Sequence, residues 1–263
     1  MNISTPISTL FNTSESNAEL IKEHSNSLEG RPNSFIPYLN VETFHCDNIQ
    51  PIHPLDNKDF DFIKKIINKC KNLKIISFHC AYRSKNVFLK DGIAHTHGYL
   101  YSEQEMKDNM SKNIPKIKNI VGDVEILIEN NNYYPTNAYD IVTDAKFISD
   151  LVYDNNIGFL FDQAHAQITA HNKILKYDEY ISNLPLDKCR QIHLCKMGYS
   201  HEWSKELGYL AKDLHICPDI FDLKNITPII VDNSVEYITI EFYKNIKELI
   251  DFIKLFKKTF NID

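Results

Sequence analysis

A chain of 263 residues is long enough for one closed β/α barrel, which needs roughly 250 residues, and leaves little over for a second domain. Hydrophobic residues make up 43% and charged residues 24%, and no apolar run approaches the roughly 18 residues of a membrane span. The formal net charge of −6 argues against a broad nucleic-acid-binding surface, because such surfaces are usually basic.

The N-terminus and the cysteines both bear on where the protein is located. The opening segment MNISTPISTLFNTSE lacks the basic region and the long apolar core of a signal peptide. The six cysteines form no Cys-x-x-Cys pair and are too sparse for a disulfide scaffold. We therefore expect a cytoplasmic protein with reduced thiols.

Short apolar runs alternate with amphipathic helical patterns along the chain. The expected strands are residues 3–10, 38–46, 74–80, 124–130, 157–162, 189–195, about 208–213, and 236–243. The expected helices are residues 57–72, 102–120, 140–155 and 245–259, and Ser102 with Glu105 forms a capping-box pattern. Strands alternating with helices predict a parallel sheet, and eight strands favour a single α/β domain over residues 1–263, a (β/α)8 TIM barrel. The stretch from Glu19 to Pro37 gives no readable strand order.

Nine potential metal ligands lie at or just beyond the ends of these strands. They are His45, His79, Glu129, Asp162, His165, His193, Asp213, His215 and Glu241. In β/α barrels the C-terminal strand ends and the loops that follow them converge on one mouth. We therefore expect these side chains, although far apart in sequence, to meet in a single site.

Charge and donor chemistry make this set a candidate metal centre. Asp162 and His165 form Asp-x-x-His directly after a strand, and Asp213 and His215 form Asp-x-His, which places both side chains on one face if extended. Four carboxylates crowded into a low-dielectric mouth would repel one another and take up protons. Two or three divalent cations would remove that repulsion. Mixed imidazole and carboxylate ligands suit iron, zinc or manganese.

A single histidine is more often a hydrogen-bonded core or surface residue than a ligand, so only the joint pattern carries weight. The remaining histidines lack the placement and are expected to be structural or exposed: His24, His53, His95, His97, His171 and His201. Strand alternation turns Cys46 and Cys80 toward the helices as small core residues. Cys195, two residues after His193, should face the same way as that histidine, and we expect it to fill space inside the barrel.

The same segments carry a family resemblance. ILIENNNYY, GFLFDQAHAQITAHN, LPLDKCRQIHLC, KDLHICPD and ITIEF, in this order, resemble the multinuclear non-heme iron-dependent oxidase family of the xylose-isomerase-like barrel superfamily. Upstream, FHCDNIQPIHPLD and ISFHCAYRS look like the family's earlier pieces, and LPLDKCRQIHL is the most specific match because it includes positions with no ligand role. HLCKMG lacks the second histidine of the family's HLAGH, and IEFYKN lacks the acidic residue after the aromatic.

The resemblance implies a function as well as a fold. It implies two or three iron ions held by all nine residues, with Glu129, Asp162 and His193 as the catalytic set. It also implies use of dioxygen to modify a ribosomally synthesised peptide, commonly at cysteine, often with a separate leader-binding partner protein. These implications rest on analogy within a fold that hosts many activities.

Three other functions stay open. A xylose-isomerase-like sugar isomerase or epimerase usually needs fewer ligands. A tri-zinc phosphodiesterase like endonuclease IV uses a similar ligand order, but the acidic balance and the segments DQAHAQITAHN and HLCKMG count against it. A non-catalytic peptide-binding barrel would have no need for four adjacent carboxylates.

Overall fold

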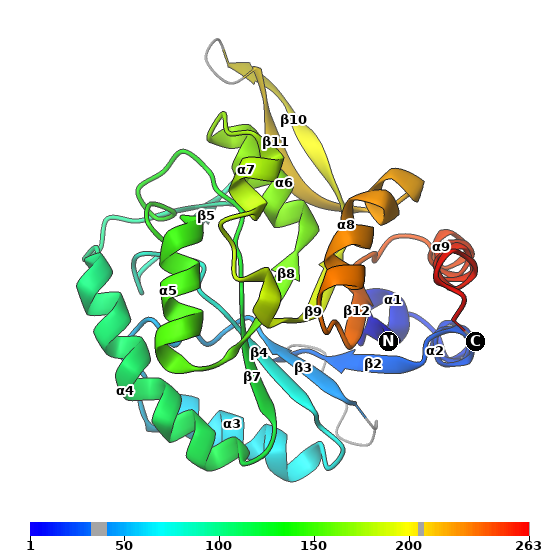
Figure 1. Cartoon of the computed structure of the whole chain (residues 1–263), viewed down its shortest axis with the longest axis horizontal. Coiled ribbons are helices and arrows are strands. Elements are labelled where there is room, and N and C mark those ends of the chain that lie inside the picture. Colours follow the sequence, from blue (N-terminus) through cyan, green and yellow to red (C-terminus); the bar gives the residue numbers. More distant parts are fainter. Residues whose placement is uncertain (33–40, 205–207, 263) are drawn as a thin grey trace.

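Eight parallel strands close into a barrel in a computed structural model of the chain, which describes residues 1–32, 41–204 and 208–262 (Figure 1). Neighbouring strands follow the order β1-β2-β3-β4-β7-β8-β9-β12, with β12 closing on β1. Their bounds are β1 Asn2–Pro6, β2 Ser27–Gly30, β3 Thr43–Cys46, β4 Ile75–His79, β7 Glu125–Glu129, β8 Gly158–Asp162, β9 Cys189–Leu194 and β12 Tyr237–Ile240. The predicted (β/α)8 TIM barrel is confirmed.

Helices connect the strands and cover the outside of the barrel (Figure 1). They are α1 Thr9–Asn12, α2 Glu15–His24, α3 Asn57–Lys69, α4 Glu103–Val121, α5 Ala145–Asn155, α6 Gln163–Asn172, α7 Tyr177–Ile181, α8 Ile220–Asp232 and α9 Ile246–Phe260, with a 3-10 turn at Leu186–Lys188. The predicted capping box begins α4: the Ser102 hydroxyl accepts from the Glu105 amide, and the Glu105 carboxylate accepts from the Ser102 amide. None of the helices in the described ranges is long and apolar enough to cross a membrane.

Strand alternation divides the side chains into two layers. The outward-facing residues, such as Phe44 on β3 and Phe161 on β8, join the large apolar core between barrel and helices. Inside the barrel, a smaller apolar layer consists of Ile75, Leu127, Leu160 and Tyr237. Cys46 and Cys80 belong to the outer core, as expected. All six cysteines are free thiols.

One of the eight predicted barrel strands is wrong. The expected strand at about 208–213 belongs to β11 Gly208–Ile216, which pairs antiparallel with β10 Lys196–Ser204 outside the barrel. Its place is taken by β2, within the stretch that showed no strand order. The four residues of β2, SLEG, include one large apolar side chain, so no two-residue alternation was visible.

Two other predicted strands differ at their ends. β1 stops at Pro6, and residues 9–10 of the first expected strand begin helix α1 instead. Of the expected strand 38–46, residues 43–46 form β3, and residues 38–40 lie outside the described residues.

The hairpin formed by β10 and β11 projects from the barrel (Figure 1). Asn172 on α6 fixes it, because the Asn172 side chain donates to the Ala211 carbonyl and accepts from the Ala211 amide, at 3.1 and 3.0 Å. The Asp213 amide also donates to the Tyr134 hydroxyl at 3.2 Å. These bonds fix the segment of β11 that carries Asp213 and His215. A second hairpin, β5 Phe88–Lys90 with β6 Ile93–His95, follows β4.

Candidate metal centre

Strand register places two pairs of the barrel ligands side by side at the mouth. His79, the last residue of β4, lies opposite Glu129, the last residue of β7. Asp162, which ends β8, lies opposite His193 on β9. His45 on β3 points to the same interior, where its Nδ1 lies 2.8 Å from the Ser77 hydroxyl. Each residue reaches the interior by the two-residue alternation of its strand.

The first group of possible ligands joins three neighbouring strands. The Nε2 atoms of His45 and His79 lie 2.9 Å apart. The Oε2 atom of Glu129 lies 2.8 Å from His79 Nε2 and 3.5 Å from His45 Nε2. Two imidazole nitrogens and a carboxylate oxygen therefore face one another in a space suited to one cation.

Glu129 also belongs to a second group. Its other oxygen, Oε1, lies 3.1 Å from His193 Nδ1 and 3.7 Å from His165 Nδ1. Glu129, Asp162 and His165 each offer a ligand atom within 4.8 Å of the others. Because its two oxygens face different partners, the Glu129 carboxylate can link two cations.

The third group contains residues from the hairpin. His215 Nε2 lies 3.5 Å from Glu241 Oε2, and His215 Nδ1 lies 3.3 Å from Asp213 Oδ1. Asp213 in turn connects to the second group, because its Oδ2 lies 3.4 Å from His165 Nε2. Glu241 connects to His193, with 3.3 Å between Oε1 and Nδ1. All nine sequence-predicted residues thus lie in one continuous network.

Asp213 and His215 reach the site from a different element than expected. They lie on the returning strand of the β10–β11 hairpin, not at a barrel strand end. His215 has a φ of 43°, in the left-handed region that costs a residue with a side chain about 1–2 kcal/mol. The residue with this strained backbone is the one whose imidazole faces Glu241. Backbone strain of this kind is common at functional sites.

Two charged residues of the site were not predicted. Glu29 on β2 is fully buried, and its Oε2 lies 3.0 Å from His193 Nε2. Arg31, which follows β2, forms ion pairs with Glu29, at 2.6 Å, and with Glu241. The signal for Glu29 was the same as for the other carboxylates, a position near a strand end, but its strand was not recognised.

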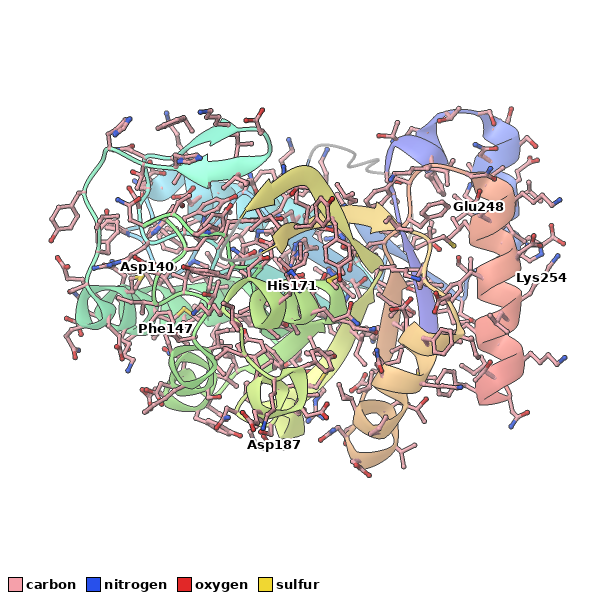
Figure 2. The ribbon with its side chains drawn as sticks, turned by 90° about the horizontal axis from the view of Figure 1, so that it is seen from above. Asp140, Phe147, His171, Asp187, Glu248 and Lys254 are labelled. Carbon is pink, nitrogen blue, oxygen red and sulfur yellow. The ribbon has the colours of Figure 1, made fainter. Side chains whose placement is uncertain are left out.

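The excluded histidines lie apart from this network where the structure describes their side chains. His53 is buried, with its Nε2 2.8 Å from the Tyr82 carbonyl oxygen. His171 lies on α6 beside the hairpin, where its Nε2 bonds to the Tyr209 carbonyl at 2.9 Å (Figure 2). The side chain of His201 lies outside the described residues.

The buried charges strongly shift one another's pKa values. Burial opposes the charge on Glu29, but Arg31 and His193 outweigh it and lower the pKa of Glu29 to about 2. Burial raises the pKa of Asp162 to about 7, although His165 opposes the rise. Burial also opposes protonation of His193, yet Glu29 and Glu241 raise the pKa of His193 well above its usual value. Protons and Arg31 therefore balance the carboxylates when no divalent cation does so.

The pKa of one imidazole, that of His45, is shifted in the opposite direction. Burial, assisted by the Arg31 guanidinium, lowers the pKa of His45 well below its usual value. A neutral imidazole is the form that binds a metal.

His165 is oriented by its Nδ1, which donates to the Asn130 carbonyl at 3.0 Å and leaves Nε2 facing Asp213. Such outer hydrogen bonds are how metal-binding histidines are usually held.

One buried oxygen atom supports the view that a metal ion fits among these donors. The Oδ1 atom of Asp162 accepts from the His165 amide at 2.7 Å, whereas its Oδ2 atom is buried and has no hydrogen-bond partner among the described residues. An unpaired buried carboxylate oxygen is costly and needs an explanation. A cation between Asp162, His165 and Glu129 would supply the missing partner, and the nitrogen and oxygen donors match iron, zinc or manganese.

The fold and the side chains define a β/α-barrel protein with a candidate multinuclear metal centre at the C-terminal ends of its strands. The family of RiPP precursor modification enzymes MbnB/TglH/ChrH matches residues 48–253, well over half of the chain. The chain belongs to this family. The resemblance seen in the sequence is thereby confirmed.

Other proteins resemble the chain more distantly. A UPF0276 protein from Paraburkholderia phytofirmans (strain DSM 17436 / LMG 22146 / PsJN) is 29% identical over 92 residues. The match covers 35% of this chain and only 29% of that relative's length.

Two solved structures share the fold over nearly their full lengths. A D-tagatose 3-epimerase-like protein aligns with a TM-score of 0.63 and 18% identity, covering 100% of this chain and 98% of that one. Endonuclease IV from Thermus thermophilus aligns with a TM-score of 0.59 and 11% identity, covering 100% of both chains. At such low identity these likenesses establish the barrel and carry no argument about activity.

Proposed function

We propose that the protein is an iron-dependent oxidase that uses dioxygen to modify a cysteine of a ribosomally synthesised peptide. The observation that carries the proposal is the Glu129 carboxylate, whose two oxygens face separate groups of imidazoles within one buried network. A bridging carboxylate between imidazole-rich groups suits redox-active iron ions held close together. The family of peptide-modifying enzymes supplies the substrate class.

The nine residues divide naturally into ligand groups. His45, His79 and Glu129 would hold one ion, Glu129, Asp162 and His165 a second, and His215 and Glu241 with Asp213 a third. The ninth residue, His193, lies between Glu129 and Glu241 and would serve the second or the third ion. Iron bound there would supply one-electron redox chemistry and Lewis acidity toward substrate and dioxygen. Glu129, Asp162 and His193 form the proposed catalytic set. Glu129 and His193 connect the groups, and Asp162 is fully buried with one oxygen that has no hydrogen-bond partner among the described residues.

Glu29 and Arg31, next to the proposed ligands, hold those ligands in position. Glu29 accepts from one nitrogen of His193, which fixes the orientation of the ring and directs its other nitrogen toward Glu129 and Glu241. Arg31 holds Glu29 and Glu241 together from the other side. These two residues are positioning residues, and such contacts commonly set metal affinity by about 10–100-fold.

Exposure indicates where the peptide would enter. Most of the network is closed to solvent, but the side chains of His79 and His215 are 24% and 30% exposed. Asp213, 15% exposed, lies next to His215. A peptide thiol would therefore approach between the end of β4 and the base of the hairpin, while the buried side excludes water from the reaction. We further propose that a separate protein binds the leader of the precursor.

The test uses protein purified without oxygen. We expect iron in excess of zinc and manganese, oxygen consumption when a cysteine-containing precursor peptide is added, and a mass change at that cysteine. Adding or omitting the product of a neighbouring gene tests the partner. Zinc as the bound metal together with cleavage of abasic DNA would contradict the proposal and favour a phosphodiesterase. Ketose epimerisation would favour a sugar enzyme, and stable peptide binding without turnover of any kind would favour a non-catalytic barrel.

A further inference from the structure

Cys195 occupies an unexpected environment inside the barrel. Along β9, Ile192 and Leu194 join the outer core, whereas His193 points into the barrel. Cys195 continues the inward series and is fully buried. It belongs to none of the apolar clusters formed by the described residues. The expectation that it only fills space accounts for its burial but not for its polar surroundings.

The neighbours of the thiol are possible metal ligands. Cys195, His215 and Glu241 each offer a ligand atom, and these three atoms lie within 4.8 Å of one another. The Cys195 sulfur also lies 3.8 Å from Asp213 Oδ1, to which its S–H group can donate a weak hydrogen bond. One residue that follows β9, two from the hairpin and one that follows β12 thus surround the same point.

We propose that Cys195 binds, as a thiolate, the metal ion held by His215 and Glu241. The inference rests on the proposed metal centre and adds to it a sulfur ligand. When the ion binds, a metal–sulfur bond forms, the S–H bond breaks and its proton leaves to solvent, with no change in oxidation state. With Asp213 beside it, this position has one sulfur, one nitrogen and two oxygen donors, enough for a four-coordinate site.

Charge around the thiol supports a cation at this point. Asp213 Oδ1 lies 3.8 Å from the Cys195 sulfur, and Glu241 offers an oxygen within 4.8 Å of it. A buried thiol among carboxylates gains little from packing and would be poorly placed as an anion on its own. A divalent cation removes both difficulties. The fully buried Oδ2 of Asp162, which has no hydrogen-bond partner among the described residues, lies in the adjoining group with Glu129 and His165 and is an independent sign that this network is built to hold cations.

With Cys195 as a ligand, the metal ions of this centre would differ in their ligand atoms. The groups around Glu129 offer only nitrogen and oxygen donors. The group around His215 adds a soft sulfur donor, which favours iron or zinc over manganese or magnesium. We therefore expect the Cys195 position to discriminate between metals more sharply than the other positions.

The test reads the metal's ligands directly, without relying on activity. The metal-free full-length protein is loaded with zinc or cobalt(II) under argon. X-ray absorption of the zinc form should show a sulfur neighbour at about 2.3 Å, and the cobalt form should show a thiolate-to-metal charge-transfer band. Both signals should disappear in Cys195→Ala, together with an affinity loss of at least about tenfold for one ion.

Controls separate this inference from the proposed function. Cys189→Ala removes a buried thiol from the other end of β9 and should leave both signals unchanged. Cys195→Ser keeps the size of the side chain, so circular dichroism of this variant checks that the barrel still folds. Wild-type protein that binds the metals with only nitrogen and oxygen neighbours would overturn the role of Cys195 while leaving the metal centre intact. Wild-type protein that binds no metal would overturn both.

Discussion

Replacement of Glu129 by glutamine is the sharpest change to the proposed centre. The amide keeps the shape of the side chain but removes its negative charge and one of its acceptor oxygens. In the structure this carboxylate lies 2.8 Å from His79 Nε2 through one oxygen and 3.1 Å from His193 Nδ1 through the other. A single substitution therefore weakens two of the proposed ion positions.

The expected magnitude follows from that double role. Loss of even an outer contact to a metal ligand commonly costs about tenfold or more in affinity. Loss of one ligand at each of two positions should therefore cost at least about 100-fold overall, or roughly 3 kcal/mol. We expect Glu129→Gln to retain the barrel's circular dichroism but to lose metal after exhaustive dialysis that leaves the wild type loaded.

The assay compares two glutamates of one strand. Metal content per chain is measured by plasma mass spectrometry for wild type, Glu129→Gln and the matched control Glu125→Gln. Glu125 lies at the opposite end of β7, where its carboxylate pairs with Arg190 and is 37% exposed. Equal metal content in Glu129→Gln and Glu125→Gln would refute the bridging role of Glu129.

Three further predictions concern stability. Chelation should lower the melting temperature, because ions at about 100 times their dissociation constant add roughly 2.7 kcal/mol each; an unchanged melting temperature would contradict tight binding. Burial lowers the pKa of His53 to about 4, so its contribution, about 3 kcal/mol, is complete above pH 6.5 and is lost as the pH falls toward 4; urea titrations of His53→Gln should show a correspondingly smaller change between these pH values. Ser102→Ala should cost about 1 kcal/mol through loss of the α4 cap, which thermal unfolding can measure.

The barrel and most of its centre follow from local patterns in the sequence. Runs such as those ending at His79 and Asp162 are long and apolar enough to be recognised as strands, and the rule that parallel strand ends share one rim then brings their last residues together. Glu29 is not predicted as part of the site, because the four residues of β2 carry too little apolar pattern to be recognised as a strand.

Other features depend on contacts that no local pattern encodes. Alternation along β9 gives the direction of Cys195, but its proximity to His215 depends on the return of the hairpin. β11 alternates like a barrel strand, yet its partner is β10, because register and pairing are tertiary choices. The ion pairs of Arg31 likewise join β2 to Glu241, at the far end of the chain.

Anomalous X-ray diffraction at the iron and zinc edges, from crystals grown without oxygen, tests the central claim most directly. We predict more than one iron peak within bonding distance of the Glu129, Asp162, His215 and Glu241 side chains. A mouth with no peak at either edge after soaking with both metals, or one occupied by zinc alone in freshly purified protein, would contradict the account.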